Sequence, residues 1–298
     1  MVRQYKIHTN LDGTDDKVWD VTNGKVRFYQ PSNLGLQSTN NIWQSNGIGV
    51  MGTRSITQPQ IEFKLETFGE SLEENYRLMK DFINDILNQK FVTLEYQTEI
   101  FQVYADLALA DVTKTEGYGK NGTFSEKITF DIITKWYTYE NLTFDMVQNG
   151  KVLSGKSKIY GGTAPGYYTY VKGVSYTYYG ETNIERLSRW DIKDEIFSFM
   201  GILYPKLPKT PTGVRFLDDT GNEYTAIVFK TEQVQDYILI NTDVNDETYQ
   251  GWKGTTALNL FPVMDFERYR TRIIEKGQME LINLSKAEFK IKRKADFV

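Results

Sequence analysis

The stretch Ser71-Leu-Glu-Glu-Asn-Tyr-Arg-Leu-Met-Lys-Asp-Phe-Ile-Asn-Asp-Ile-Leu-Asn-Gln89 decides how the first half of the chain folds. Ser71 and Glu74 have the spacing of a capping box, in which each side chain accepts a hydrogen bond from a backbone N–H left without a helical partner. Apolar residues then recur at the spacing of one helix face: Leu72, Tyr76, Met79, Phe82, Ile83, Ile86 and Leu87. The sequence therefore predicts a helix over Ser71–Gln89 whose apolar stripe lies against the sheet built by the flanking strands.

On both sides of this helix, apolar and polar residues alternate as they do in half-buried strands. The run Ile61–Glu66 alternates in this way before the helix, and a period of two indicates a strand. Two further runs, Val103–Leu109 and Phe124–Ile132, are separated by the turn-rich Glu116–Asn121. Two alternating runs joined by a turn predict an antiparallel hairpin.

The glycine-rich stretch Gly150–Gly166 separates this half from a second strand-rich half. Its composition fits a linker or a projecting hairpin. The terminal run Met279–Val298 sets apolar residues among lysines, which predicts a strand at an exposed sheet edge. Two segments, Trp190–Met200 and Phe261–Ile274, fit a helix or a strand. The other strand-like segments are Tyr167–Tyr179, Val214–Leu217, Tyr224–Phe229 and Tyr237–Asn241.

The composition bounds the class of protein. A length of 298 residues favours two domains with separate cores. The net charge of −4 argues against a protein that grips nucleic acid by neutralising its phosphates. Cysteine is absent, which removes disulfides, thiolate metal sites and cysteine nucleophiles. The start of the chain has no apolar signal region, and no uncharged apolar run reaches the roughly 18 residues of a membrane span. We expect a chain that folds in a cytosol and does not enter a membrane.

Two glycine patterns, within Gly47–Gly52 and Gly117–Gly122, match the G-x-G-x-x-G fingerprint of dinucleotide-binding proteins. The fingerprint requires a strand that leads through the glycines into a helix, whose N-terminus faces the pyrophosphate. The first pattern leads toward Pro59 and a strand, and the second joins two strands. We interpret both sets as turn glycines.

Histidine and oxygen-rich loops offer little for catalysis or metal binding. His8 is the only histidine, so a Ser-His-Asp triad would have to use it. Its strand neighbours Lys6 and Asn10 are typical of a solvent-facing strand surface. A calcium-binding EF-hand needs alternate acidic positions, a central glycine and a distal glutamate, and neither of the loops Asp12–Asp16 and Asp243–Glu247 supplies all three. We interpret them as turns, and we predict no metal site.

Paired carboxylates are the remaining catalytic candidates. Glu73–Glu74 lies on the solvent side of the predicted helix start, and Asp218–Asp219 lies in a predicted turn. A glycoside hydrolase needs one carboxylic acid with a raised pKa, which requires burial. Neither pair fits, so we predict no catalytic residue and no cofactor, and we expect that the chain is not an enzyme.

Tyrosines crowd between residues 160 and 179. Because tyrosine combines apolar area with a polar tip, such a cluster suits a protein-binding or sugar-stacking surface. It is equally compatible with two sides of ordinary aromatic strands. Between the two functional interpretations, protein contact is favoured over sugar. The predicted partner-binding residues are Lys151, Lys156, Lys158, Tyr160, Tyr167, Tyr168 and Tyr170.

The order of these segments over the whole chain resembles the distal tail proteins of siphophages. A strand, the capped helix, a strand and the hairpin ending at Thr123–Thr138 follow the order of the family's N-terminal domain. The segment Ile128–Trp136, followed by Tyr167–Tyr179, is similar to the lactococcal members of this family. The resemblance rests on the order of elements along the full length.

The resemblance implies a mainly β fold with two domains. Residues 1–136 would form an N-terminal β-sandwich with one α-helix and a β-hairpin, which assembles into a hexameric ring. Residues 137–298 would form a C-terminal galectin-like β-sandwich with an arm-like extension. Gly150–Gly166 is the first candidate for part of that extension, and Tyr204–Gly213 is the second.

The resemblance also implies partners and a location. The ring would join the tail tube protein to the tail-tip hub protein in the baseplate of the virion. Its arms would anchor trimers of the receptor-binding protein for host attachment. DNA would pass through the lumen without specific binding, and the acidic balance fits a conduit to which DNA should not adhere.

One departure limits what the resemblance implies. Sugar-binding galectins use a histidine, an arginine and an asparagine beside a tryptophan, and His8 lies outside the C-terminal half. Lectin activity therefore does not carry over with the shape. The tyrosine cluster keeps open the alternative of a carbohydrate-binding module that contacts the host surface. A wall-degrading glycosidase is a more distant alternative.

Overall fold

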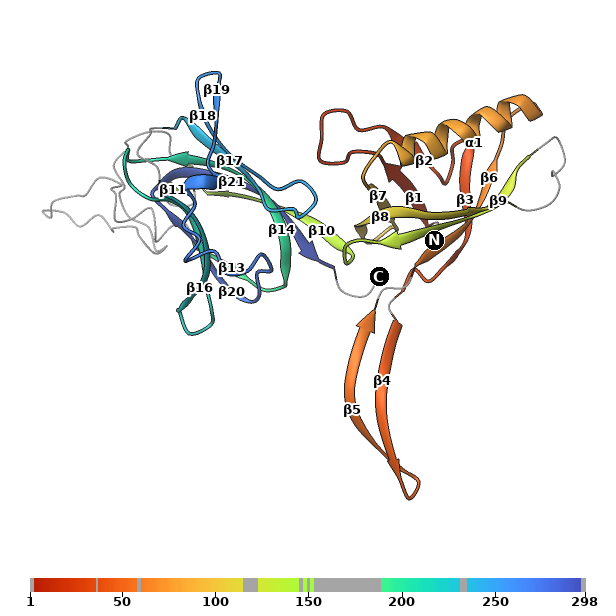
Figure 1. Ribbon diagram of the computed structural model, residues 1–298, viewed down its shortest axis with the longest axis horizontal. Helices are drawn as coiled ribbons and strands as arrows, with labels where there is room; N and C mark the ends of the chain where they lie inside the picture. Colours follow the sequence, from red (N-terminus) through yellow and green to blue (C-terminus); the bar gives the residue numbers. More distant parts are fainter. Residues whose placement is uncertain are drawn as a thin grey trace, which may run out of the picture. The chain divides into compact units, whose positions relative to one another are not determined.

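The computed structural model describes residues 3–35, 37–57, 60–114, 123–144, 147–148, 151–152, 189–230 and 235–295. The chain divides into two compact units, and each has its own hydrophobic core. Unit 1 is Met1–Thr138 with Ala295–Val298, and unit 2 is Tyr139–Lys294. The described part is mainly β-strand with one α-helix, which confirms the predicted fold class (Figure 1). It contains no helix with the length and hydropathy that a membrane crossing requires.

Unit 1 is built on an antiparallel sheet that folds over its own core. The strand order is β2-β1-β7-β8-β9-β6-β3. The two ends of this sheet meet where the backbone N–H of Phe28 donates to the carbonyl of Val21 (2.7 Å). Aromatic rings fill the core, and Phe28 stacks on Phe63 with ring centroids 4.6 Å apart. The strands are β1 (Gln4–His8), β2 (Val18–Asp20), β3 (Val26–Ser32), β6 (Ile61–Thr67), β7 (Val92–Gln97), β8 (Gln102–Thr113) and β9 (Ser125–Ile132).

The predicted helix and its flanking strands are confirmed. Helix α1 (Leu72–Leu87) begins after Ser71, whose Oγ accepts a hydrogen bond from the backbone N–H of Glu74 (3.1 Å). The Glu74 carboxylate accepts one from the backbone N–H of Glu70 (2.8 Å). The helix packs against β3 and β6 and buries Phe82 (Figure 1). The runs predicted as a hairpin form the antiparallel pair β8–β9.

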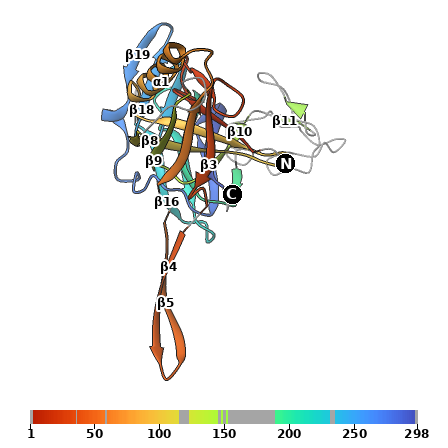
Figure 2. The same cartoon turned by 90° about the vertical axis from the view of Figure 1, so that its right-hand side faces the viewer.

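A further hairpin in unit 1, β4 (Gln37–Ser45) and β5 (Ile48–Thr57), was not expected from the sequence. Asn46 and Gly47 form its two-residue turn, both with positive φ (51° and 79°), which is the backbone of the type I′ hairpin turn. Of the first glycine pattern, only Gly47 is a turn residue, and Gly49 and Gly52 lie in β5. Within the described residues β4 and β5 pair only with each other, and Figure 2 shows them as a separate two-stranded ribbon.

Unit 2 is a sandwich of two antiparallel sheets. One sheet has the order β19-β18-β17-β14-β21-β10, and the other has the order β13-β20-β15-β16. Phe199 of the first sheet meets Phe216 of the second, with ring centroids 5.9 Å apart in the core. The strands are β10 (Tyr137–Phe144), β11 (Val147–Gln148), β12 (Lys151–Val152), β13 (Arg189–Ile192), β14 (Ile196–Pro205), β15 (Thr212–Leu217), β16 (Glu223–Phe229), β17 (Tyr237–Asn241), β18 (Thr248–Lys253), β19 (Thr256–Asn259), β20 (Gly277–Ile282) and β21 (Leu284–Lys294), with the 3-10 turn η2 (Phe261–Val263).

The predicted edge strand at the C-terminus is wrong. Strand β21 lies between β14 and β10 inside the first sheet of unit 2. Lys292 exposes only 4% of its surface, and its Nζ lies 2.9 Å from Asp243 Oδ2. A lysine that finds a carboxylate partner can lie inside a sheet, so lysine frequency alone does not identify an edge.

The remaining predicted segments have mixed outcomes. Val214–Leu217, Tyr224–Phe229 and Tyr237–Asn241 are strands as predicted. The ambiguous Trp190–Met200 contributes to β13 and β14, whereas Phe261–Ile274 is an irregular segment that starts with η2.

The two candidates for an extension differ in what the structure describes. Of Gly150–Gly166, only β12 is described. Tyr204–Gly213 contains the short connection between β14 and β15. Asn283 holds this connection, because its side-chain amide donates to the carbonyl of Leu207 (3.0 Å) and its side-chain oxygen accepts from the Leu207 N–H (3.0 Å).

Candidate interaction surfaces

The β4–β5 hairpin carries large apolar side chains on both of its faces. Residues directly opposite each other in an antiparallel pair share a face, and Trp43 lies opposite Val50 while Ser45 lies opposite Ile48. We call Trp43, Ile48 and Val50 the hairpin face; they expose 68%, 70% and 62% of their surface. Ile42 and Met51 lie opposite each other on the other side. Such a group of exposed apolar side chains marks a surface that another protein covers.

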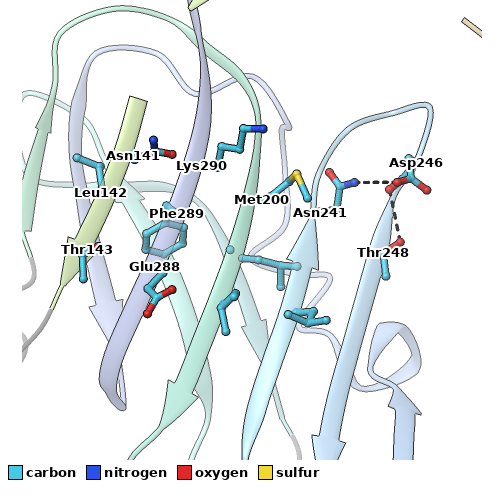
Figure 3. A pocket seen from close by; sticks show the side chains of 14 residues that line it. Asn141, Leu142, Thr143, Met200, Asn241, Asp246, Thr248, Glu288, Phe289 and Lys290 are labelled. Atoms are coloured by element: carbon cyan, nitrogen blue, oxygen red, sulfur yellow. Dashed lines mark hydrogen bonds between the residues drawn. The ribbon is translucent and has the colours of Figure 1, made fainter. Parts of the chain in front are cut away.

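A groove of about 540 Å³ lies on the outer face of the first sheet of unit 2 (Figure 3). Side chains alternate between the two faces of a strand, so buried Phe199 and Leu203 point into the core while Met200 and Ile202 point outward. With Leu239 they form an aliphatic floor. Polar residues border this floor: Asn141, Glu288 and Lys290 on one side and Asn241, Asp246 and Thr248 on the other.

The groove does not suit stacking on a sugar ring. Its one aromatic lining residue, Phe289, exposes only 3% of its surface and packs edge-on against Phe199 in the core. Sugar-binding sites of the kind considered for the tyrosine cluster need an exposed aromatic face. An aliphatic floor instead suits the apolar side chains of a protein partner.

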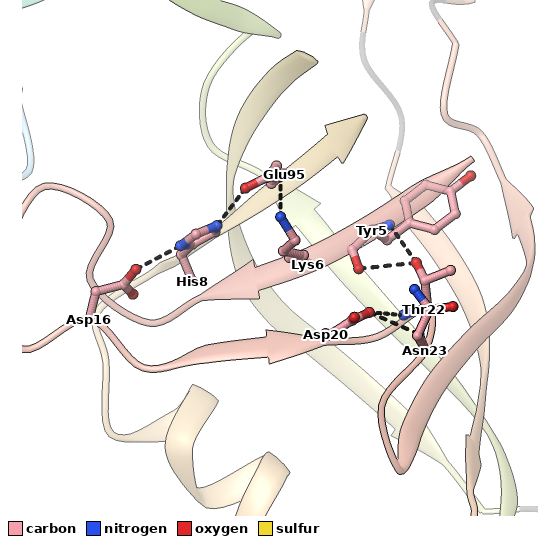
Figure 4. A network of polar contacts seen from close by, with 8 residues as sticks. All are labelled: Tyr5, Lys6, His8, Asp16, Asp20, Thr22, Asn23 and Glu95. Atoms are coloured by element: carbon pink, nitrogen blue, oxygen red, sulfur yellow. Dashed lines mark hydrogen bonds and ion pairs between the residues drawn. The ribbon is translucent and has the colours of Figure 1, made fainter. Parts of the chain in front are cut away.

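A network of charged side chains fastens the first strand of unit 1 (Figure 4). His8 Nδ1 lies 2.6 Å from Asp16 Oδ2, and His8 Nε2 lies 2.8 Å from Glu95 Oε2. Lys6 Nζ donates to the other Glu95 oxygen (2.8 Å). Since a carboxylate only accepts, both ring nitrogens donate only when the imidazole carries two protons. The predicted solvent-facing position of His8 is wrong, because His8 exposes only 7% of its surface. Its contacts with Asp16 and Glu95 connect the loop after β1 to β7.

The environment of Glu95 favours its charged form. Burial by itself would raise the pKa of the Glu95 carboxyl, but the hydrogen bonds from Lys6 and His8 outweigh it and hold the pKa below its ordinary value. Folding therefore favours the charged form of Glu95, and the charged form in turn stabilises the folded chain. This network stabilises the fold, and His8 has a structural role in it because its ring lies between the carboxylates of Asp16 and Glu95.

We expect Glu95→Gln to lower the stability of unit 1 by about 2 kcal/mol near pH 7, because buried hydrogen bonds to charged groups are lost. A lowered folded-state pKa means that this contribution is present above the unfolded-state pKa of about 4.3 and disappears as the pH falls through the folded-state value. Urea unfolding should therefore show a gap between wild type and variant that narrows from about pH 7 to about pH 3. Glu62→Gln, which removes a surface ion pair with Lys127, is the control and should change stability by less than about 1 kcal/mol. A gap that is independent of pH would contradict the assignment.

The two carboxylate pairs considered for catalysis have low rather than raised pKa values where a shift is seen. The hydrogen bond from Lys25 holds the pKa of Glu74 below its usual range. The hydrogen bond from Thr220 does the same for Asp218. Neither carboxyl group can therefore serve as the protonated general acid of a glycosidase.

The loop after β17, which was considered for calcium binding, has the hydrogen bonds of a turn. The Asp243 carboxylate accepts a hydrogen bond from the backbone N–H of Asn245 (3.0 Å), as the side chain of a turn residue does. No group of three or more histidine, aspartate or glutamate side chains in the described ranges could hold a metal ion.

The predicted partner-binding residues fall largely outside the described residues. Lys151 lies in β12, where the backbone is described and the side chain is not. The other six predicted positions have no described structure: Lys156, Lys158, Tyr160, Tyr167, Tyr168 and Tyr170. Their role stays a prediction. The second glycine pattern, Gly117–Gly122, is likewise outside the described residues.

Two family descriptions match the chain almost from end to end. The N-terminal domain of the distal tail protein matches residues 4–133, and the domain described as Dit, C-terminal domain, matches residues 135–298. The distal tail protein of Lactococcus phage p2 is 94% identical to this chain over 298 residues, 100% of both proteins. The distal tail protein of Lactococcus phage SK1 is 91% identical over the same full lengths.

Solved structures agree with these sequence matches. A chain in the structure of the phage P2 baseplate in its activated conformation with Ca is similar at a TM-score of 0.80 and 94% identity, with 100% of both chains covered. The SPP1 Dit protein, described as a paradigm of the hub adsorption apparatus in phages that infect Gram-positive hosts, has a TM-score of 0.53 at 11% identity. That match covers 98% of this chain and 99% of the other, and it supports the shared fold alone.

Two compact β units with groups of exposed apolar side chains are features expected of a structural protein that assembles with others. The chain belongs to the distal tail protein family, and it is a structural component of the phage tail tip. The resemblance inferred from the order of elements is confirmed, together with the structural role and the location that it implied.

Proposed function

We propose that the chain forms the hexameric hub ring that joins the tail tube to the baseplate. The observation that carries this proposal is the hairpin face, because Trp43, Ile48 and Val50 are large, apolar and exposed in the isolated chain. Water contact with such a group is unfavourable by roughly 25 cal/mol for each Å², so association with further copies is the expected state. The proposed number of six copies in the ring comes from the resemblance to distal tail proteins, which form hexameric rings.

The two compact units support a division of labour between two domains. Residues 1–136 form the ring through unit 1, which carries the hairpin and the single described helix. Residues 137–298 form a galectin-like sandwich whose arm-like extension anchors trimers of the receptor-binding protein. Further partners are the tail tube protein and the tail-tip hub protein, and DNA passes through the lumen. The 94% identity to a chain of the phage P2 baseplate supports assembly into a baseplate.

In this proposal the chain has a structural role only, and it neither catalyses a reaction nor binds the host surface directly. The pKa values of Glu74 and Asp218 are lowered, which does not suit the acid of a glycosidase, and the groove of unit 2 has an aliphatic floor. The alternative of a carbohydrate-binding module therefore depends on the tyrosine cluster alone.

Native mass spectrometry of the purified chain tests the ring. We expect a dominant species of six copies, and electron micrographs of the same sample should show closed rings. Dilution should dissociate the ring, since its stability depends on protomer concentration. A chain that stays monomeric at every concentration, alone and with its tail partners, would overturn the proposal.

A further inference from the structure

Apolar side chains extend around helix α1 over a wider arc than the part of the helix that packs against the sheet of unit 1. At about 100° per residue, one arc of the helix faces the core: Leu78, Phe82, Ile86 and Met79. A second apolar arc lies directly beside it: Leu72, Ile83, Tyr76 and Leu87. A surface helix needs an apolar arc of roughly 100°, and the two arcs together span about 180° at this spacing.

Within the second arc, Ile83 is half-buried and packs against the core of unit 1, but the other three side chains stay outside it. We call Leu72, Tyr76 and Leu87 the helix stripe; they expose 48%, 64% and 62% of their surface. Phe124, next to β9, lies beside the stripe, with its ring centroid 6.1 Å from that of Tyr76. The sequence pattern that predicted the helix contains these residues because they are apolar, yet the sheet does not bury them. Unit 1 therefore has two groups of exposed apolar side chains, the helix stripe and the hairpin face.

A closed ring of identical copies requires two different surfaces on each copy. In a cyclic assembly larger than a dimer, each subunit presents one patch to the neighbour on one side and a different patch to the neighbour on the other. The two patches must be complementary in shape, apolarity and charge. The hairpin face and the helix stripe have the character of such a pair, since each contains one large aromatic residue of the kind that dominates interfaces.

The two surfaces also match in length and charge. A helix of 16 residues is about 24 Å long. Strands of 9 and 10 residues reach about 30 Å. Arg54 is the only charged residue of the hairpin. Helix α1 carries four acidic and two basic side chains, a net charge of −2. The hairpin is therefore weakly positive and the helix weakly negative, so their charges are complementary.

We propose that the helix stripe of one copy is covered by the hairpin face of the next copy in the ring. Trp43, Ile48 and Val50 would then lie against Leu72, Tyr76 and Leu87 of the neighbour. This interface rests on the proposed ring and specifies which surfaces close it. The opposite side of the hairpin, with Ile42 and Met51, remains available to another surface of the assembly.

Disulfide trapping tests this pairing, because the natural chain has no cysteine. The double variant Val50→Cys/Tyr76→Cys is assembled under reducing conditions and then oxidised. We expect a covalent ladder of multiples of the chain on denaturing gels. The matched control is Val50→Cys/Ile100→Cys, since Ile100 is an exposed apolar residue elsewhere in unit 1. Cross-linked product should be at least about tenfold more abundant for the first pair.

Mixing the two single variants separates contacts between copies from contacts within a copy. Val50→Cys mixed with Tyr76→Cys should give covalent dimers, whereas each variant oxidised alone should give few. A second pair, Ile48→Cys/Leu87→Cys, serves if the first double variant does not assemble. Rings that form and show no bond in either pair would overturn this interface and leave the ring in place. A bond that forms only within one chain would overturn it as well. A chain that never assembles would instead overturn the ring itself.

Discussion

Replacing Trp43, Ile48 and Val50 together by serine should leave a folded chain that no longer assembles. These side chains are highly exposed and lie on a hairpin that pairs with no other described strand. Their removal should therefore change the free energy of unfolding by less than about 0.5 kcal/mol each, as for other surface substitutions. In the assembly the same side chains are expected to be buried, so their removal should weaken the association between copies rather than the folding of each copy.

The size of the effect follows from the kind of residues that are removed. An interfacial tryptophan contributes about 2 kcal/mol or more, and truncating the isoleucine and the valine adds roughly 1 kcal/mol each from lost apolar burial. About 4 kcal/mol weakens each contact roughly 10³-fold. Because every contact in a ring is weakened equally, we expect native mass spectrometry to show monomers where the wild type shows the ring.

The control for this triple variant is a second set of exposed apolar residues. Ile100→Ser and Val244→Ser remove side chains of similar exposure outside the hairpin and should leave the oligomeric state unchanged. Circular dichroism should show the same strand content and thermal midpoint for all variants. A triple variant that assembles at the wild-type concentration would show that the hairpin face is not an interface.

Patterns that act within a few residues were sufficient to predict much of the fold. The helix was predicted because its capping residues and apolar stripe are local, and the β8–β9 pair because it is a hairpin with alternating side chains. The β4–β5 hairpin was missed although its turn contains the signal, Asn46-Gly47. A strand pattern is missing on either side of this turn, because the two strands pack on no core and mix apolar with polar residues.

Pairings between distant residues could not be predicted from one sequence. His8 and Glu95 are far apart in the chain and meet because β1 pairs with β7. The interior position of β21 depends in the same way on its pairing with β14. The groove of unit 2 combines residues from five strands and their loops. The helix stripe is left exposed because of how far the sheet extends beneath the helix. Each of these features is set by the arrangement of strands, which leaves no local sequence signal.

Lys292→Ala should be among the most destabilising single substitutions in unit 2. The Lys292 ammonium lies inside the sandwich sheet and contacts Asp243, which exposes 9% of its surface. Asp243 also organises the loop after β17, since its carboxylate accepts the backbone N–H of Asn245. Removing the lysine leaves a buried carboxylate without its counter-charge, which costs about 3–5 kcal/mol.

A double-mutant cycle separates the ion pair from simple loss of packing. Asp243→Ala combined with Lys292→Ala should recover part of the loss, because the double variant has no buried charge left unpaired. Lys286→Ala on the same strand removes a half-exposed ion pair with Glu288 and should cost less than about 1 kcal/mol. Urea unfolding of the four variants measures all of these terms. If Lys292→Ala cost no more than Lys286→Ala, the pair would not fasten the loop to the sheet. Lys292 would then contribute no more to stability than a half-exposed lysine of the same strand does.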